Sequence, residues 1–322
     1  MNDYRNLDQI LKIKVIGVGG AGNNAINRMI EDNVRDVSFY MINTETGTLR
    51  RARTSNTLQI GVQTTRGLGA GANEIVGERA AIENKEDIKR MLEGADLVFI
   101  TAGMGGGTGT GAAPIVAEIA KEMGILTIGI VTKPFSFEGK ARQLRAERGI
   151  ERLRNNVDDL IVVLNDSLLK ITNSKVTLNN AFFVADSVLE QGVTGITDLL
   201  TSVGEVNIDF ADIRTTLSNR GNAYMGIGKA IGPDKVESAV KQAIENPLTE
   251  KKIDGAKGII FNIKGNDNLS LMEINSAVAL INEKVSEDAN IIFGTTIDEY
   301  MGDEVSVTVI ATGVEDKIEI NQ

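Results

Sequence analysis

The sequence contains no cysteine and no histidine, and these two absences remove several classes of chemistry at once. Without cysteine there is no thiol nucleophile and no disulfide framework. Without either residue there is no Cys/His zinc site and no histidine general base. Any metal ion that the chain binds must therefore be held by oxygen atoms.

Long hydrophobic runs are also missing. No segment approaches the roughly 20 apolar residues that cross a bilayer as a helix, and the polar start MNDYRNLDQI lacks the profile of a secretory signal peptide. We therefore expect a cytoplasmic protein without direct membrane insertion.

Positive charge is in the minority, with 34 Lys and Arg residues against 44 Asp and Glu residues and a formal net charge of −10. A nucleic-acid backbone or an anionic membrane surface would require a basic face, so we expect neither as the main partner, although local basic patches stay possible. The length of 322 residues favours two domains.

Apolar runs alternate with helix-like segments through the first half of the chain. Near-continuous Val and Ile runs of this kind are typical of a parallel sheet covered on both faces. The expected strands are 12–18, 37–43, 57–62, 94–103, 124–135 and 158–165. The expected helices include 21–33, one that follows the glycine-rich loop near 70, 112–123 with Pro114 in its first turn, and a basic helix at 139–154.

A long helical pattern follows at 177–203, with one apolar stripe formed by Leu189, Val193, Ile196 and Leu200. Beyond it we expect strands at 222–230, 258–265, 290–297 and 304–313, with helices at 234–246 and 270–285. The expected class is α/β, with a Rossmann-like parallel-sheet domain (1–176), a central connecting helix (177–203), a second smaller α/β domain (204–315) and a short polar tail (316–322).

Two glycine-rich turns, GVGGAGNN at 17–24 and GMGGGTGTG at 103–111, each follow a strand-like run and open a helix-like segment. Such a turn directs backbone N–H groups and the positive end of a helix dipole at one point, which suits phosphate. Two such turns predict a polyphosphate held from two sides.

The first turn alone is ambiguous. Gly17, Gly19 and Gly22 satisfy the GxGxxG pattern of dinucleotide-binding proteins, and Glu45 could serve marginally as the acid which that pattern expects. A tight turn that binds nothing is the alternative. The second turn has six glycines, two threonines and no lysine, so it is neither a dinucleotide fingerprint nor a P-loop. Phosphate charge would then be met by N–H groups, the helix dipole and Mg²⁺.

These turns, together with NTET (43–46), GLGAGAN (67–73), TKPFSFEGKARQ (132–143), NDSLL (165–169) and NIDFAD (207–212), resemble the tubulin/FtsZ family of GTPases. The resemblance covers essentially the entire chain, in order and at matching spacing, and GGGTGTG (105–111) is the signature of the family. It implies the tubulin/FtsZ fold, GTP or GDP as ligand, and Mg²⁺ held mainly by the phosphates, with no metal ligand from the protein.

The resemblance also implies a role for each part of the nucleotide site. The α- and β-phosphates would contact Gly20, Ala21, Gly22, Asn23 and Asn24 from one side and Gly103, Gly105, Gly106, Gly107, Thr108, Gly109 and Thr110 from the other. The γ-phosphate would approach Ala70, Gly71 and Ala72, and the ribose would contact Thr132, Glu138 and Arg142. Guanine would be recognised by Asn165 and Asp186 and stacked on Phe182.

Several of these residues also have simpler explanations. Glu138 and Arg142 are four residues apart and could form an ordinary ion pair on one helix face. For Phe182 and Phe183 the simpler explanation is core packing, with one ring in the core while the other stacks on the base.

The catalytic residues implied by the resemblance are Asp209 and Asp212, with Asn207 beside them. Acids in a first helical turn also fit a plain helix cap. If the long helix is unbroken from Asp186 to about Thr201, however, these carboxylates lie at least ~20 Å from the base pocket. A kink at Gly192 or Gly195 would shorten that distance.

At that distance Asp209 and Asp212 would serve the nucleotide of a neighbour stacked head to tail, and such a contact propagates as a filament. The expected partner is thus a homopolymer, and the resemblance implies a location in the cytoplasm at the division site. Division-machinery adaptors are expected for the family, but the tail that binds them is missing from a chain that stops at Gln322.

Three positions depart from the usual family pattern. Glu45 replaces a common Asp, Glu74 replaces a common Pro, and Lys133 replaces a common Arg. Two other functions stay open from the sequence, a dinucleotide-dependent oxidoreductase and a non-enzymatic nucleotide-gated scaffold.

Overall fold

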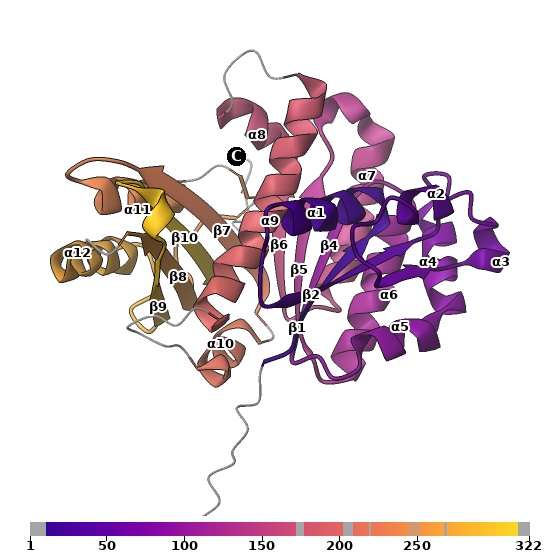
Figure 1. Cartoon of the computed structure of the whole chain (residues 1–322), viewed down its shortest axis with the longest axis horizontal. Helices are drawn as coiled ribbons and strands as arrows, with labels where there is room; N and C mark the ends of the chain where they lie inside the picture. Colours follow the sequence, from indigo (N-terminus) through magenta and orange to yellow (C-terminus); the bar gives the residue numbers. More distant parts are fainter. Residues whose placement is uncertain are drawn as a thin grey trace, which may run out of the picture.

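The computed structural model describes residues 11–171, 177–201, 209–218, 220–245, 248–249, 251–266 and 269–314. Within these ranges, ten strands form one mixed sheet in the order β3-β2-β1-β4-β5-β6-β7-β10-β8-β9 (Figure 1). All neighbouring pairs from β3 to β7 are parallel, β10 is antiparallel to both of its neighbours, and β8 and β9 are parallel. The strands are β1 (Ile13–Val18), β2 (Val37–Asn43), β3 (Thr57–Gln59), β4 (Leu97–Gly103), β5 (Leu126–Lys133), β6 (Asp159–Leu164), β7 (Gly221–Ala230), β8 (Gly258–Gly265), β9 (Asn290–Ile297) and β10 (Val305–Thr312).

The parallel part of the sheet is covered by helices on both faces, as the sequence predicts. Along β1, Ile13 and Val15 pack into one hydrophobic cluster with the helices at 19–31 and 178–201, whereas Ile16 and Val18 pack into another with the four helices between residues 74 and 154. The helices of this part are α1 (Gly19–Glu31), α2 (Thr46–Leu49), α3 (Val62–Thr65), α4 (Glu74–Glu83), α5 (Lys85–Leu92), α6 (Thr108–Glu122), α7 (Lys140–Arg154) and α8 (Asn165–Ile171).

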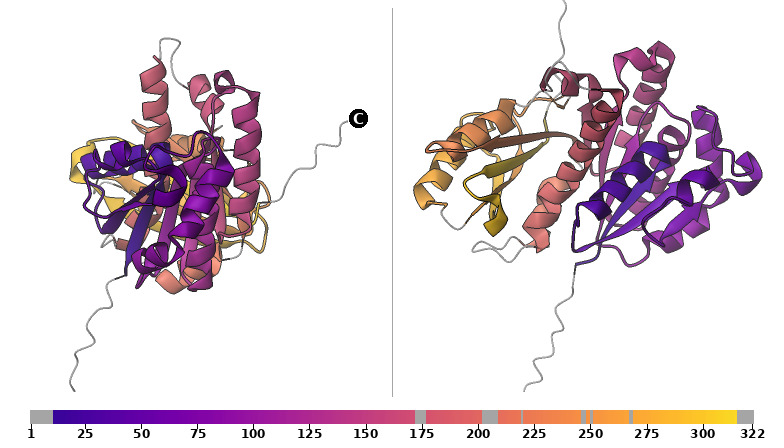
Figure 2. Two further views of the ribbon diagram at one scale, coloured as in Figure 1. Left: turned by 90° about the vertical axis from the view of Figure 1, so that its right-hand side faces the viewer. Right: turned by 45° about the horizontal axis from the view of Figure 1, so that its top comes forward.

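Helix α9 (Leu178–Thr201) lies between the two groups of strands (Figure 2). Its residues Leu189, Val193 and Ile196 are fully buried, in a cluster shared with β5, β7 and β10. The helix is continuous through Gly192 and Gly195. A Cβ on Gly195 would lie 2.5 Å from the Thr308 side chain, so this glycine permits close packing and does not mark a kink.

The C-terminal strands form a third hydrophobic cluster with α11 (Lys235–Glu245) and α12 (Leu271–Asn282). A short helix, α10 (Phe210–Leu217), precedes β7, and two 3₁₀ turns occur at Ser136–Glu138 and Glu299–Met301. The proposed domain boundaries at 176 and 203 and the tail 316–322 lie outside the described residues.

Two local expectations were wrong, and the helices α2, α3, α5 and α8 were not predicted. The strand expected at 57–62 ends at Gln59, because Gly61 adopts a left-handed conformation (φ +65°) and the chain turns into α3. Pro114 lies inside α6 and not in its first turn, because the glycine-rich segment itself enters the helix and moves its start to Thr108. In the described part of the chain, no helix is both long and apolar enough to cross a membrane.

Candidate functional site

A cavity of about 260 Å³ lies at the carboxyl ends of the parallel strands, where loops following β1, β2, β4, β5 and β6 meet α9. Such strand ends are the usual ligand site of open parallel sheets. The lining residues are Gly20, Ala21, Asn43, Glu45, Gly69, Ala70, Ala72, Gly103, Met104, Gly106, Gly107, Thr108, Gly109, Thr132, Pro134, Glu138, Arg142, Asn165, Phe182, Ala185 and Asp186.

The first glycine-rich turn carries the chain from β1 into α1. Helix α1 begins at Gly19 with no side-chain cap and no acid in its first turn, so its N-terminal N–H groups suit an anion. Gly20 and Ala21 line the cavity. Gly22 does not, and its role is packing, since a Cβ there would lie 2.4 Å from the carbonyl oxygen of Thr101 on β4.

Two asparagines predicted as phosphate contacts lie outside the cavity lining. Asn23 is only 1% exposed, its Nδ2 donates to the Gly17 carbonyl at 2.8 Å, and its Oδ1 accepts from Asn43 Nδ2 at 2.7 Å. Asn24 is exposed and also does not line the cavity. Asn43, which the sequence analysis did not select, does line it.

The second glycine-rich turn joins β4 to α6, which also begins without a side-chain cap or an acid in its first turn. Five of the predicted residues line the cavity: Gly103, Gly106, Gly107, Thr108 and Gly109. Gly105 and Thr110 instead bind each other, because the Gly105 N–H donates to Thr110 Oγ1 at 2.8 Å. Met104 lines the cavity and was not predicted.

The third loop, which precedes α4, contributes Ala70 and Ala72 to the lining, together with the unpredicted Gly69. Gly71 does not reach the lining. Beside this loop, the hydroxyls of Thr44 and Thr108 are hydrogen-bonded at 2.7 Å, so the end of β2 is tied to the start of α6. Glu45 also lines the cavity, and its Oε2 accepts from Thr48 Oγ1 at 3.1 Å.

Thr132, Glu138 and Arg142 line the wall beyond β5. Arg142 Nε and Glu138 Oε2 form an ion pair at 3.1 Å. The two residues therefore form the ordinary ion pair that was the simpler explanation, and they also line the cavity. The sequence suggested that the two residues share one helix face, and the structure shows that they do not. Glu138 ends a 3₁₀ turn, and Gly139 (φ +97°) separates it from α7.

Asn165 and Asp186 form the far end of the cavity, beyond β6. Asn165 is 4% exposed, and its Oδ1 has no hydrogen-bond partner among the described residues. Burial raises the pKa of the Asp186 carboxyl to about 7, although the nearby Arg28 guanidinium opposes the shift. A buried, unpaired acceptor beside a desolvated carboxyl is costly unless a ligand supplies donors.

The two adjacent phenylalanines point to different neighbours, and neither is in the core. Phe182 is 39% exposed, lines the cavity and meets the Phe135 ring edge-on, with 5.4 Å between ring centroids. Phe183 is 55% exposed, and the Arg28 guanidinium lies 3.5 Å from its ring centroid. Arg28 also pairs with Glu190, whose pKa is raised to about 7, mainly by burial.

The predicted catalytic acids lie far from this cavity. Asp209 is the N-cap of α10, and its Oδ1 accepts from the Ala211 N–H at 3.1 Å. Asp212 is in the first turn of the same helix, whereas Asn207 lies outside the described residues. Helix α10 is near the lower end of α9 in Figure 1. The residues of α9 that line the cavity, Phe182, Ala185 and Asp186, belong to the N-terminal half of that helix. From Asp186 to Thr201, α9 spans about 22 Å at 1.5 Å per residue.

Two family matches cover most of the chain. Residues 12–173 match the GTPase domain of the Tubulin/FtsZ family, and residues 221–315 match the C-terminal domain of the FtsZ family. The structure is similar to an FtsZ dimer from M. jannaschii described as empty, with 42% identity, a TM-score of 0.90, and coverage of 94% of this chain and 88% of the other.

A point mutant of the M. jannaschii protein gives 43% identity and a TM-score of 0.91, with coverage of 94% of this chain and 91% of the other. CetZ1 from Haloferax volcanii, at 22% identity, shares the fold with a TM-score of 0.81 and 95% coverage of both chains. The chain belongs to the tubulin/FtsZ family of GTPases.

Proposed function

We propose that this protein binds GTP in the cavity, polymerises head to tail into the protofilaments of a cell-division ring, and hydrolyses GTP at the contact between subunits. The observation that carries the proposal is the separation between the cavity and Asp212 at opposite ends of α9. A subunit that holds its ligand at one end and its acids at the other needs a second subunit to complete the site.

The order of the strands supports one orientation of the ligand. Asn165 and Asp186 lie at the β6 and α9 end, and their oxygens suit the N1 and N2 hydrogens of guanine, which adenine does not offer together. The phosphates then extend across the two glycine-rich turns after β1 and β4. The terminal phosphate reaches the β2 and β3 side, where Glu45 and the loop at 69–72 lie.

We assign Mg²⁺ mainly to the phosphates. Within the described ranges no three acidic side chains gather into a group that could hold a metal ion, although Glu45 offers one carboxylate at the terminal-phosphate end. Oxygen donors of this type suit Mg²⁺. When bound, the ion would supply charge neutralisation for phosphoryl transfer.

Hydrolysis rests on positioning and electrostatics. The uncapped N-termini of α1 and α6 present N–H groups to the phosphate charge. Asp212 and Asp209 of the adjacent subunit would orient the attacking water and accept its proton, since both lie at the start of α10, Asp209 as its N-cap and Asp212 in its first turn.

Assembly follows from the geometry of this contact. The cavity end of one subunit meets the α10 end of the next, and a contact between two different surfaces continues along a filament. The M. jannaschii FtsZ described as a dimer supports self-association in a relative. Location at the division site and binding to division adaptors complete the proposal.

The test is the rate of phosphate release per subunit as protein concentration rises. The proposal requires this specific rate to increase above an assembly threshold, and a rate that stays flat across assembly overturns it. Filaments without phosphate release would identify a nucleotide-gated scaffold instead. A competition titration with NADH and a fluorescent GTP analogue addresses the oxidoreductase alternative.

A further inference from the structure

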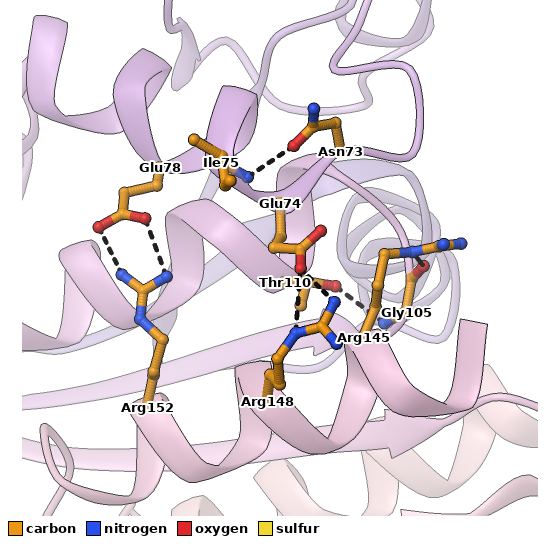
Figure 3. Close-up of polar contacts among 9 residues, drawn as sticks. All are labelled: Asn73, Glu74, Ile75, Glu78, Gly105, Thr110, Arg145, Arg148 and Arg152. Atoms are coloured by element: carbon orange, nitrogen blue, oxygen red, sulfur yellow. Dashed lines mark hydrogen bonds and ion pairs between the residues drawn. The ribbon is translucent and has the colours of Figure 1, made fainter. Parts of the chain in front are cut away.

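Three arginines on α7 face the helix that follows the third cavity loop. Arg145, Arg148 and Arg152 share one face of α7, and Glu74 and Glu78 share the opposing face of α4 (Figure 3). Arg148 Nη2 and Nε both reach Glu74 Oε1, at 2.5 and 3.2 Å. Arg152 binds both oxygens of Glu78, at 2.6 and 2.9 Å.

On its other side, α4 is in backbone contact with α6. A Cβ on Gly111 would lie 2.0 Å from the Glu74 carbonyl oxygen, and a Cβ on Gly77 would lie 2.3 Å from the Gly107 carbonyl oxygen. Helix α4 therefore cannot move closer to α6. Its position against α6 is fixed by contact, and Arg148 and Arg152 bind it from the α7 side.

Glu74 is the first residue of α4, directly after the loop 69–73. This loop has three residues in the left-handed region, Gly69 (φ +88°), Gly71 (φ +57°) and Ala72 (φ +57°). Ala72 is disfavoured there because it has a Cβ. A loop with this backbone depends on its ends, and the Arg148 pair holds one of them.

The same face of α7 also holds the second glycine-rich turn. Arg145 Nε donates to the Gly105 carbonyl at 3.1 Å, while the Gly105 N–H is bound to Thr110. A Cβ on Gly149 would lie 2.3 Å from Thr110 Cγ2, so α7 is in tight contact with α6. Helix α7 thus contacts the second glycine-rich turn directly, and it reaches the end of the loop 69–73 through Glu74.

We propose that Arg148 is a positioning residue that holds the loop 69–73 at a set distance from the turn 104–107, and so sets the preference for GTP over GDP. The inference rests on the proposed binding of guanine nucleotides. By the strand order, only the third phosphate extends to the loop 69–73, and GDP ends before it. Loosening the loop therefore weakens GTP binding more than GDP binding.

The experiment measures dissociation constants for fluorescent GTP and GDP analogues below the assembly threshold, in wild type, Arg148→Ala and Glu74→Gln. Because the Arg148 side chain is 59% exposed, the expected loss is modest, about threefold for GTP with GDP unchanged. Arg152 lies one helical turn farther from the loop, so Arg152→Ala should lose less GTP affinity than Arg148→Ala. The double exchange Arg148→Glu with Glu74→Arg should restore the wild-type ratio of the GDP and GTP dissociation constants.

The matched control is Lys85→Ala, which breaks the ion pair of Lys85 and Glu122 between α5 and α6 and should leave the ratio unchanged. Two results overturn the positioning role of Arg148 and leave the proposed function standing. One is an unchanged ratio of the two dissociation constants in Arg148→Ala, and the other is an equal loss of affinity for both nucleotides with a lower melting temperature. A wild-type protein that binds neither nucleotide overturns the proposed function and this inference with it.

Discussion

The side-chain amide of Asn43 donates to that of Asn23 at 2.7 Å, and this bond joins the end of β2 to the first turns of α1. Asn23 also donates to the Gly17 carbonyl. Asn23→Ala leaves these buried groups unpaired, so we expect a loss of about 1–3 kcal/mol in the free energy of unfolding, measured by urea titration without nucleotide.

The neighbouring Asn24 is exposed, so Asn24→Ala should change that free energy by less than about 0.5 kcal/mol. If Asn23→Ala is equally neutral and only nucleotide affinity falls, Asn23 is a phosphate contact and not a structural one.

The raised pKa of Asp186 should make GTP affinity depend on pH near neutrality. With a pKa of about 7, the carboxyl is increasingly protonated below pH 7. Protonation turns one of its two acceptor oxygens into a donor, so the carboxyl no longer accepts both guanine hydrogens. Binding must then release a proton, so affinity should fall as pH drops, by up to about tenfold per pH unit. Titrations of a fluorescent GTP analogue from pH 5.5 to 8 measure this slope.

Glu190 provides the control for that slope, because its pKa is also raised to about 7 but it does not line the cavity. Glu190→Gln should keep the slope, whereas Asp186→Asn should bind more weakly and lose it. A pH-independent affinity in the wild type would contradict the assignment of Asp186 to the base.

Asp159 makes the protein less stable as pH rises. It is buried, neither carboxylate oxygen has a partner among the described residues, and burial raises its pKa well above the usual range. Its stabilising contribution is complete below the unfolded pKa of 3.8 and is lost progressively as pH rises toward the folded pKa. We expect Asp159→Asn to raise the melting temperature more at pH 8 than at pH 5, and an equal effect at both would contradict the burial argument.

The fold follows from apolar periodicity, which is local information. The predicted bounds of β2, β8 and β9 match the structure, and α9 follows from its apolar stripe. Asn43 could have been found in the same way, because it is the last residue of a predicted parallel strand, where ligands bind.

Other features depend on contacts between distant segments, and no local pattern carries them. Gly20 and Gly22 look alike in the sequence, and only the approach of Thr101 on β4 makes Gly22 a packing residue. The pairs Arg148–Glu74 and Arg152–Glu78 join residues 74 positions apart. Helix α6 begins at Thr108 and includes Gly109 and Gly111, although helix propensity alone assigns these glycines to a loop.

The two acids of α10 should differ when each is changed to alanine. Asp212→Ala should keep GTP binding and lose turnover, and mixing it with wild type should reduce hydrolysis more than dilution does, because each mutant subunit impairs its neighbour's site. Asp209→Ala should also destabilise the protein by about 1 kcal/mol, since Asp209 caps α10. Normal hydrolysis by Asp212→Ala, measured by phosphate release, would contradict the shared site.

The glycines of the two turns separate into ligand-facing and packing residues by the space around each. A Cβ on Gly20 or Gly106 meets nothing within 4 Å, whereas one on Gly111 would lie 2.0 Å from the Glu74 carbonyl oxygen. Gly20→Ala and Gly106→Ala should therefore fold with near wild-type stability and lose nucleotide affinity, because the added methyl group enters the cavity that both residues line.

Gly111→Ala must instead push α4 away from α6, at a cost of about 1–3 kcal/mol or more in stability. Thermal unfolding without nucleotide separates the two classes. If Gly20→Ala unfolds as easily as Gly111→Ala, the first turn is structural and the phosphate contacts assigned to it are wrong.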